Sequence, residues 1–315
     1  METRRIIRFG KNSYVISIPK SWITENKLEK GDSVFIEDDS QELRIMPSEK
    51  IKRVEIKKTI IETDNRDLDT IRSEIISAYL MNFNIIELIG SNVSENVSSI
   101  KSVLRDLSGL EIMDLTSKRI TAHDIVNEDE IDLQNIFRRV DMIIRSMISD
   151  AVKTIETDLY ENINARDSDV NRLVFLAFRV LRKAISDPQV ARKMNMSMLD
   201  VMNYWITFSH MESIGDQAKR AARYIRQMTD KNEKSHKEFV KLFSEINDLH
   251  ISVMKSFYTK DRALAFRVIE DCKKANAKCD KYLIQNATFA AANAVGYVKS
   301  MNGLIKHIAR LVSTI

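Results

Sequence analysis

Residues 13–23 read SYVISIPKSWI, and this stretch decides how the first part of the chain is built. Tyr14, Ile16 and Ile18 occur at every second position, so we expect them to share one face of a strand. Pro19 follows at once and fixes φ at about −65°, which the interior of a strand tolerates poorly and the start of a helix tolerates well. The stretch therefore predicts an abrupt switch from strand to helix at Pro19.

The flanking segments extend this pattern to a small unit at residues 1–48, with the order strand, strand, short helix, strand, strand. RRIIRF predicts the first strand. KSWITENKL predicts a helix that ends before Gly31, a residue able to adopt the positive φ that closes a helix. SVFIEDD and QELRIMP predict a hairpin over an acidic turn.

Residues 50–127 predict a second unit, a connector with the order β-α-β-α-β. One of its helices spans residues 67–83, where four apolar residues recur at helical spacing: Leu68, Ile71, Ile75 and Tyr79. A final strand region spans residues 111–125. The unit has no Gly-rich phosphate loop and no catalytic constellation, so we expect a spacer or dimerisation role, with small-molecule sensing as the alternative.

From residue 130 onward the sequence predicts long amphipathic helices. Apolar residues recur there at spacings of three and four in two stripes: Ile136, Val140, Ile143, Met147, Ala151, Ile155 and Leu159, then Val170, Leu173, Ala177, Leu181 and Ala184. Pro188 lies in the turn after the second stripe. Long helices with short connections predict an antiparallel bundle at residues 130–315. The predicted fold class is therefore multidomain α+β, with a small β-rich head, an α/β connector and an all-α bundle.

The composition excludes several classes of protein. The 49 basic and 45 acidic residues give a net charge of only +4, so a polyanionic partner has to be argued from local clusters of charge. The cysteines, Cys272 and Cys279, provide neither a disulfide framework nor a metal-binding motif. The least polar window, residues 283–298, is interrupted by amide side chains, so no membrane span is predicted.

The N-terminal residues contain no apolar run long enough for a signal peptide, and we expect a soluble, cytoplasmic protein. The histidines are scattered and show none of the HxxxH or HExxH spacings typical of metal sites. No nucleophile motif is present. We therefore expect that the protein is not an enzyme.

A cluster of basic residues stands at the start of the chain: Arg4, Arg5, Arg8, Lys11 and Lys20. Against them residues 1–20 contain a single acid, Glu2, so the local charge is 5 − 1, or +4. Arg4 and Arg8 are expected on one strand face. A two-stranded ribbon with a basic end fits the phosphate backbone or the major groove of DNA. The alternative is an ordinary solvated edge, because Lys and Arg also protect strand edges from aggregation.

Residues 4–45 resemble the AbrB/SpoVT swapped-hairpin family of DNA-binding domains. The matching features are the basic opening strand, SYVISIPKSW, KGD at residues 30–32 and two closing strands. In that family two chains interleave their hairpins into one dimeric barrel, and basic residues near the N-terminal hairpin contact DNA. The resemblance implies a homodimer through the N-terminal domain and assigns the DNA contacts to Arg4, Arg5, Arg8, Lys11 and Lys20.

The stretch MESIGDQAKRAA, residues 211–222, carries two acids on one helix face. Glu212 and Asp216 are four residues apart, so their charges repel unless something positive compensates. One interpretation is internal pairing of Asp216 with Lys219 or Arg220. The other is a carboxylate-lined metal site shared with a neighbouring helix, as helical bundles build in their cores.

The same stretch resembles the PhoU family, whose tandem three-helix repeats each carry an E-x-x-x-D motif. Residues 165–176, ARDSDVNRLVFL, resemble its second helix and add Asp167 to the predicted site. The resemblance implies repeats at about 130–228 and 232–315 and a divalent or iron ion held by Glu212, Asp216 and Asp167. In the second repeat Lys299 and Gly303 stand where Glu and Asp are expected, and Glu270 and Asp271 are further candidate ligands.

An AbrB-like head on a PhoU-like body resembles archaeal phosphate-uptake regulators. We therefore expect a DNA-binding transcriptional regulator of phosphate uptake, whose bundle senses a ligand, a metal or a transporter partner. The first alternative is an adaptor that does not bind DNA and docks on a phosphate transporter or sensor kinase, with the head serving only to dimerise. The second is a metal-binding bundle.

Overall fold

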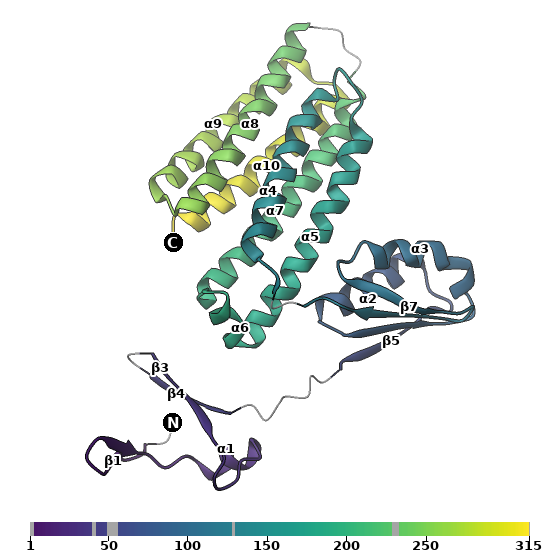
Figure 1. Cartoon of the computed structure of the whole chain (residues 1–315). Helices are drawn as coiled ribbons and strands as arrows, with labels where there is room; N and C mark the ends of the chain where they lie inside the picture. The colour runs from purple at the N-terminus through teal and green to yellow at the C-terminus, as the bar shows by residue number, and fades with distance from the viewer. Residues whose placement is uncertain (1–2, 40–41, 49–55, 128–129, 229–232, 315) are drawn as a thin grey trace. The chain divides into compact units, whose positions relative to one another are not determined.

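The computed structural model describes residues 3–39, 42–48, 56–127, 130–228 and 233–314 (Figure 1). The chain divides into two compact units, Met1–Glu55 and Ile56–Ile315. The β-rich head, the sheet-containing connector and the helical region follow one another in the predicted order, so the predicted fold class is confirmed. The border predicted near residue 130 falls inside the second unit, and the division into three domains stays a prediction.

The first unit contains two antiparallel hairpins around a short helix. Its elements are β1 (Ile7–Phe9), β2 (Ser13–Val15), α1 (Lys20–Glu25), β3 (Val34–Asp39) and β4 (Glu42–Pro47). The predicted order is confirmed, although the centre of the acidic turn lies outside the described residues. Pro19 caps the N-terminus of α1 with φ −59°, which confirms the switch from strand to helix.

The end of α1 differs from the prediction. The helix stops at Glu25, and Lys27 adopts the left-handed conformation just beyond it, with φ 52°. Gly31 also has a positive φ, 101°, but lies four residues further along, in the approach to β3. The prediction that Gly31 closes the helix is therefore wrong. Backbone bonds from Lys27 and Leu28 to carbonyls of α1 complete the turn without a glycine.

The connector folds as a four-stranded sheet with two helices. Its elements are β5 (Lys58–Glu62), α2 (Leu68–Leu80), β6 (Ile85–Ile89), α3 (Val93–Arg105), β7 (Leu110–Leu115) and β8 (Arg119–Asp124). The strand order is β5-β6-β8-β7, with β5 and β6 parallel and the other pairs antiparallel. The predicted single strand at residues 111–125 is therefore a hairpin. The chain reverses where Thr116 donates its backbone N–H to the carbonyl of Arg119 at 2.8 Å.

A small core lies between the sheet and its helices. Ile71, Ile75 and Tyr79 of α2 are buried, as their helical spacing predicts. They pack with residues such as Ile86 of β6 in one hydrophobic cluster. Leu68, predicted to share their face, is 40% exposed because it is the first residue of the helix.

The rest of the second unit is helical. Its elements are α4 (Leu133–Lys153), α5 (Tyr160–Ser186), α6 (Pro188–Lys193), α7 (Met198–Ile225), α8 (Glu233–Thr259), α9 (Arg262–Asn286) and α10 (Phe289–Val312). Figure 1 shows the long helices packed side by side. Among the described residues, none of the helices is both long and apolar enough to span a membrane.

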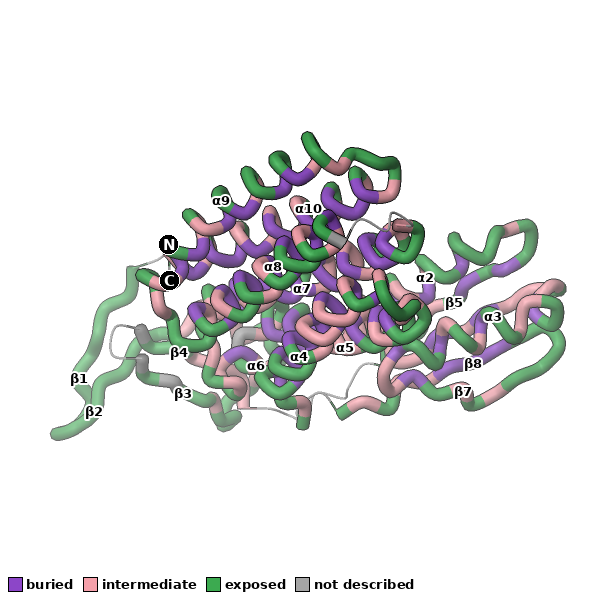
Figure 2. The backbone as a smooth tube through the Cα atoms, turned by 90° about the horizontal axis from the view of Figure 1, so that it is seen from above, coloured by how far each residue is buried: buried purple, intermediate pink, exposed green. Residues whose placement is uncertain are grey.

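One hydrophobic cluster runs through all six long helices, and Figure 2 shows its buried positions on their facing sides. The predicted stripes lie mostly in this core, with Val140 and Met147 of α4 and Ala177 of α5 fully buried. The first stripe is shorter than predicted. Ile155 and Leu159 pack against the core from the turn that follows α4.

Candidate functional site

The basic residues of the first unit surround the β1–β2 hairpin. Arg8 pairs with Tyr14 across the hairpin, and its Nη2 donates to the carbonyl of Lys11 at 3.4 Å, in the turn. Lys20 is the first residue of α1. All five predicted DNA contacts are exposed: Arg4, Arg5, Arg8, Lys11 and Lys20.

The hairpin is shorter than the alternating sequence predicts. Because β1 begins at Ile7, Arg4 precedes the strand, and the prediction that it shares a strand face with Arg8 is wrong. Because β2 ends at Val15, Ile16 and Ile18 lie outside it, so the shared face predicted for them and Tyr14 does not form. Only three residue pairs hold the two strands together, and such a ribbon is marginally stable by itself.

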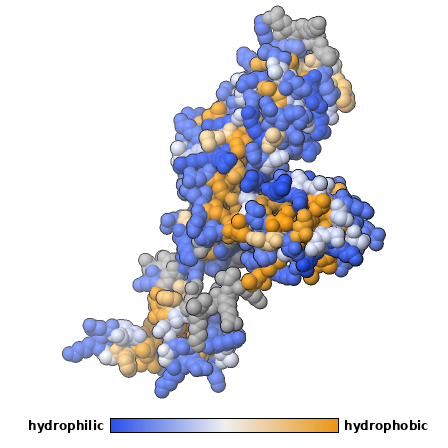
Figure 3. Space-filling view, turned by 45° about the vertical axis from the view of Figure 1, so that its right-hand side comes forward, coloured by the Kyte–Doolittle hydropathy of each residue, from blue (hydrophilic) through white to orange (hydrophobic). Residues whose placement is uncertain are grey.

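None of the side chains described in residues 3–48 is buried. Large apolar side chains of both hairpins are instead strongly exposed: Ile6 70%, Ile7 61%, Phe9 69%, Tyr14 69%, Phe35 57%, Ile36 63% and Leu43 65%. Figure 3 shows hydrophobic surface on this unit, at the bottom of the view. Exposed apolar surface of this kind marks an interaction site, because its burial is worth about 25 cal/mol per Å².

Two of the three predicted metal ligands, Asp167 and Asp216, form ion pairs with Lys219. Asp167 of α5 is buried, and the Nζ of Lys219 donates to its Oδ2 at 2.5 Å. Lys219 also lies 3.4 Å from Asp216, whose other oxygen is 2.7 Å from the Nε of Arg220. Burial disfavours the charge on Lys219, but the hydrogen bond that Lys219 donates to Asp167 outweighs this effect and raises the pKa of the lysine. The two aspartates are thus neutralised within the bundle.

Glu212 lies beside this cluster with a different environment. Burial, followed by the nearby charge of Asp216, raises the pKa of Glu212 above its usual value of 4.5. Its polar contact is with Ser213, whose hydroxyl donates to Oε2 at 3.3 Å. A bound cation would offset the repulsion between Glu212 and Asp216. It would have to compete with Lys219, which already pairs with Asp216 and Asp167.

The further candidate ligands are arranged as surface ion pairs. Glu270 and Asp271 of α9 each lie 2.7 Å from a lysine three residues later in the helix. Cys272 and Cys279 are free and buried, which raises the pKa of their thiols to about 12 and about 11. Over residues 3–314, wherever the structure describes them, no three His, Cys, Asp or Glu side chains are grouped to hold a metal ion. The metal ion stays a prediction that requires Lys219 to move.

A buried polar network that the sequence does not predict lies between α4 and α8. Asp141 of α4 is 3% exposed and accepts from Nε and Nη2 of Arg145 at 2.8 and 2.6 Å. From α8, Nε2 of His250 lies 3.1 Å from Oδ1, and the hydroxyl of Tyr258 donates to Oδ2 at 3.1 Å. Burial opposes the charge of Asp141, but the bonds from His250 and Arg145 prevail and lower its pKa. The Asp141–Arg145 spacing was visible in the sequence, whereas the partners on α8 were not.

Comparison with known proteins gives two findings. Residues 7–53 match a family model described as antidote-toxin recognition MazE, bacterial antitoxin. This confirms the AbrB-like character predicted for the N-terminal segment. Among solved structures, the chain is similar to one described as the crystal structure of PhoU from Pseudomonas aeruginosa, at 18% identity and a TM-score of 0.49 over 59% of this chain and 96% of that chain. A comparison with curated proteins gives no match.

Proposed function

We propose that the chain is a dimeric DNA-binding transcriptional regulator, and that its first unit is the DNA-binding part. The observation that supports this most is the exposed cluster of Arg4, Arg5, Arg8 and Lys11 on a hairpin unit that matches an antitoxin family. Lys and Arg side chains of this kind neutralise DNA phosphates and release counterions.

The dimer is supported by the absence of buried side chains among the described residues of the first unit. Each copy exposes apolar side chains from both hairpins, and two copies that interleave would bury them against each other. The same pairing would lengthen the three-residue ribbon of β1 and β2, because an edge strand is completed by a neighbour. Two basic hairpins would then face DNA together.

The helical part of the second unit is the proposed sensor. Residues 211–222 resemble PhoU proteins, and the regulated process is accordingly phosphate uptake, sensed through a ligand or through docking on a phosphate transporter or sensor protein. Packing changes among the helices would alter the relation between the paired hairpin units. Such a mechanism needs two states of the bundle whose balance the sensed partner shifts.

The test is enrichment of genomic fragments. The full chain is mixed with sheared genomic DNA at two salt concentrations, and the fragments that stay bound at the higher one are sequenced. We expect a reproducible set of fragments. The Arg4→Ala/Arg5→Ala/Arg8→Ala variant should lose this set.

The matched control removes three exposed arginines of the second unit, in the variant Arg72→Ala/Arg139→Ala/Arg267→Ala. It should retain the same fragments as the wild type. Absence of any enriched fragment with the wild-type chain would contradict the proposal. It would favour the adaptor, in which the hairpin unit only dimerises.

A further inference from the structure

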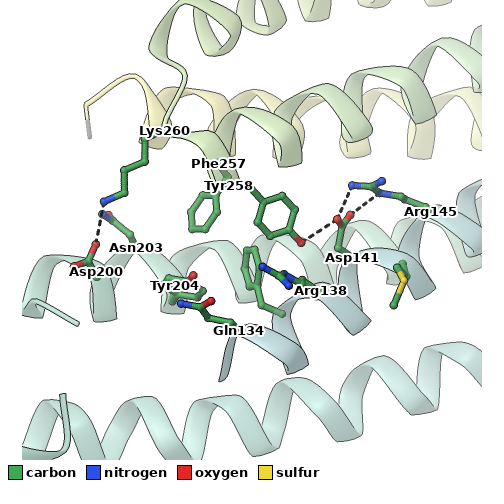
Figure 4. Close-up of a pocket in the computed structure, with 12 residues that line it drawn as sticks. Gln134, Arg138, Asp141, Arg145, Asp200, Asn203, Tyr204, Phe257, Tyr258 and Lys260 are labelled. Atoms are coloured by element: carbon green, nitrogen blue, oxygen red, sulfur yellow. Dashed lines mark hydrogen bonds and ion pairs between the residues drawn. The ribbon is translucent and has the colours of Figure 1, made fainter. Parts of the chain in front are cut away.

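A cavity of about 520 Å³ opens between α4, α7 and the end of α8, next to the Asp141 network (Figure 4). Its size falls in the range of small-molecule sites. One wall is aromatic and is formed by Phe137, Tyr204, Phe257 and Tyr258. Phe137 contacts the other three rings at centroid distances of 4.9 to 5.7 Å, so the wall is tightly packed.

The two carboxylates of this cavity are already engaged. Asp141 is held by the network described above. Asp200 caps α7, where its Oδ2 accepts from the backbone N–H and the hydroxyl of Ser197 at 3.0 and 2.6 Å. The hydrogen bond from the Ser197 hydroxyl is the main reason that the pKa of Asp200 is lowered, although burial acts in the opposite direction. Both carboxylates are therefore already held by residues of the chain.

Two cations of the cavity are less firmly held. Arg138 of α4 lines the cavity and makes no ion pair with any residue of the described chain. Lys260, in the turn after α8, is 66% exposed and lies 3.8 Å from Asp200, at the limit of an ion pair. The cavity thus presents three cations, Arg138, Arg145 and Lys260, and two carboxylates, Asp141 and Asp200, an excess of one positive charge.

The strongest sign of a built site is Asn203. Its side chain lines the cavity and is only 3% exposed, yet its Nδ2 has no hydrogen-bond partner within the described chain. A buried donor without a partner costs about 1–3 kcal/mol, so native structures rarely keep one without a reason. An acceptor oxygen of a bound molecule would satisfy it.

We propose that this cavity binds a small organic anion with an aromatic ring. Its phosphate or carboxylate group would accept from Asn203 and pair with Arg138 and Lys260, while the ring would pack on the aromatic wall. Inorganic phosphate alone would leave the wall uncovered. The inference rests on the proposed function only in assigning the anion the role of effector, because binding itself requires no DNA.

Isothermal titration of the full chain tests the proposal with four probes. They are 1-naphthyl phosphate and 2-naphthoate as ring anions, inorganic phosphate as the bare anion, and 1-naphthol as the neutral ring. At least one ring anion should bind at one site per chain, and at least tenfold more tightly than inorganic phosphate and 1-naphthol. Comparison of the two ring anions identifies the anionic group. Equal affinity for bare and ring-bearing anions, or no saturable binding, would overturn the proposal.

Arg138→Ala and Arg139→Ala form a matched pair, because both are exposed arginines of α4 and only Arg138 lines the cavity. The first should weaken binding at least tenfold and the second less than twofold. Asn203→Leu should also weaken binding without lowering the thermal midpoint of the free protein, since it removes an unsatisfied donor. Equal loss in Arg138→Ala and Arg139→Ala would overturn the site. DNA binding measured separately shows whether the regulator proposal fails independently.

Discussion

Arg179 of α5 and Asp124 of β8 form an ion pair whose side chains are only 1% and 5% exposed. The Nε of Arg179 also donates to Oδ1 of Asn82 at 3.0 Å, and its guanidinium carbon lies 4.4 Å from the ring centroid of Tyr79. One side chain therefore ties the bundle to a strand, a helix end and a turn of the connector. These buried contacts hold α5 against the connector.

Arg179→Met should lower the free energy of unfolding by about 3–5 kcal/mol, because it leaves the Asp124 carboxylate buried without its charge partner. Denaturant titration of the full chain measures this. The double variant Arg179→Met/Asp124→Leu should be less destabilised than the single one, since a buried pair replaced by apolar residues is often neutral. A single variant within 1 kcal/mol of the wild type would show that these contacts contribute little.

The stability of the folded first unit should depend on protein concentration, because the proposed dimer would supply its core. Ile36→Glu places a charge on an apolar position that is 63% exposed in one chain and should convert the dimer to a monomer. Light scattering after gel filtration measures the mass. Ile185→Glu, at a residue of α5 that is 51% exposed, is the control and should leave the dimer intact. Equal masses for both variants would argue against the hairpins as the dimer interface.

Glu212 gives a pH dependence with a definite sign. Its folded-state pKa is raised above 4.5 by burial and by Asp216, so the folded state holds its proton to higher pH than the unfolded state. Its contribution is full below about 4.5 and is lost as the pH rises through the folded-state pKa. Glu212→Gln should flatten this part of the stability profile and raise the stability at pH 7. A steeper profile in the variant would contradict the assignment.

Lys219→Met should leave Asp167 buried and unpaired, and stability at pH 7 should fall by about 2–4 kcal/mol. Elemental analysis of the purified wild-type protein tests the metal prediction at the same site. A stoichiometric divalent or iron ion, lost in Glu212→Ala/Asp216→Ala, would support a metal site at these carboxylates.

The features that the sequence predicts well are local. Helical spacing located Val140 and Ala177 in the core, and the φ restriction of Pro19 located the start of α1. The cap of that helix was missed because Lys27 adopts a conformation usually reserved for glycine. Such an exception depends on the surrounding turn rather than on residue type.

Contacts between residues that are far apart in the chain produce no regular spacing in the sequence, so they could not be predicted from it. His250 meets Asp141 across 109 residues and Arg179 meets Asp124 across 55, and each pair depends on how separate elements pack. Lys219 was foreseen as a partner of Asp216 from its spacing. Its hydrogen bond to Asp167 could not be predicted, because it depends on the packing of α7 against α5.

The proposed binding of DNA by the basic hairpin is tested by the salt dependence of the affinity. Fluorescence anisotropy of a labelled duplex gives the slope of log K against log salt concentration, to which each phosphate contact contributes about −0.9. A steep wild-type slope is expected, shallower in Arg4→Ala/Arg5→Ala/Arg8→Ala and unchanged in Arg72→Ala/Arg139→Ala/Arg267→Ala. A flat wild-type slope, or equal slopes in both variants, would contradict the claim.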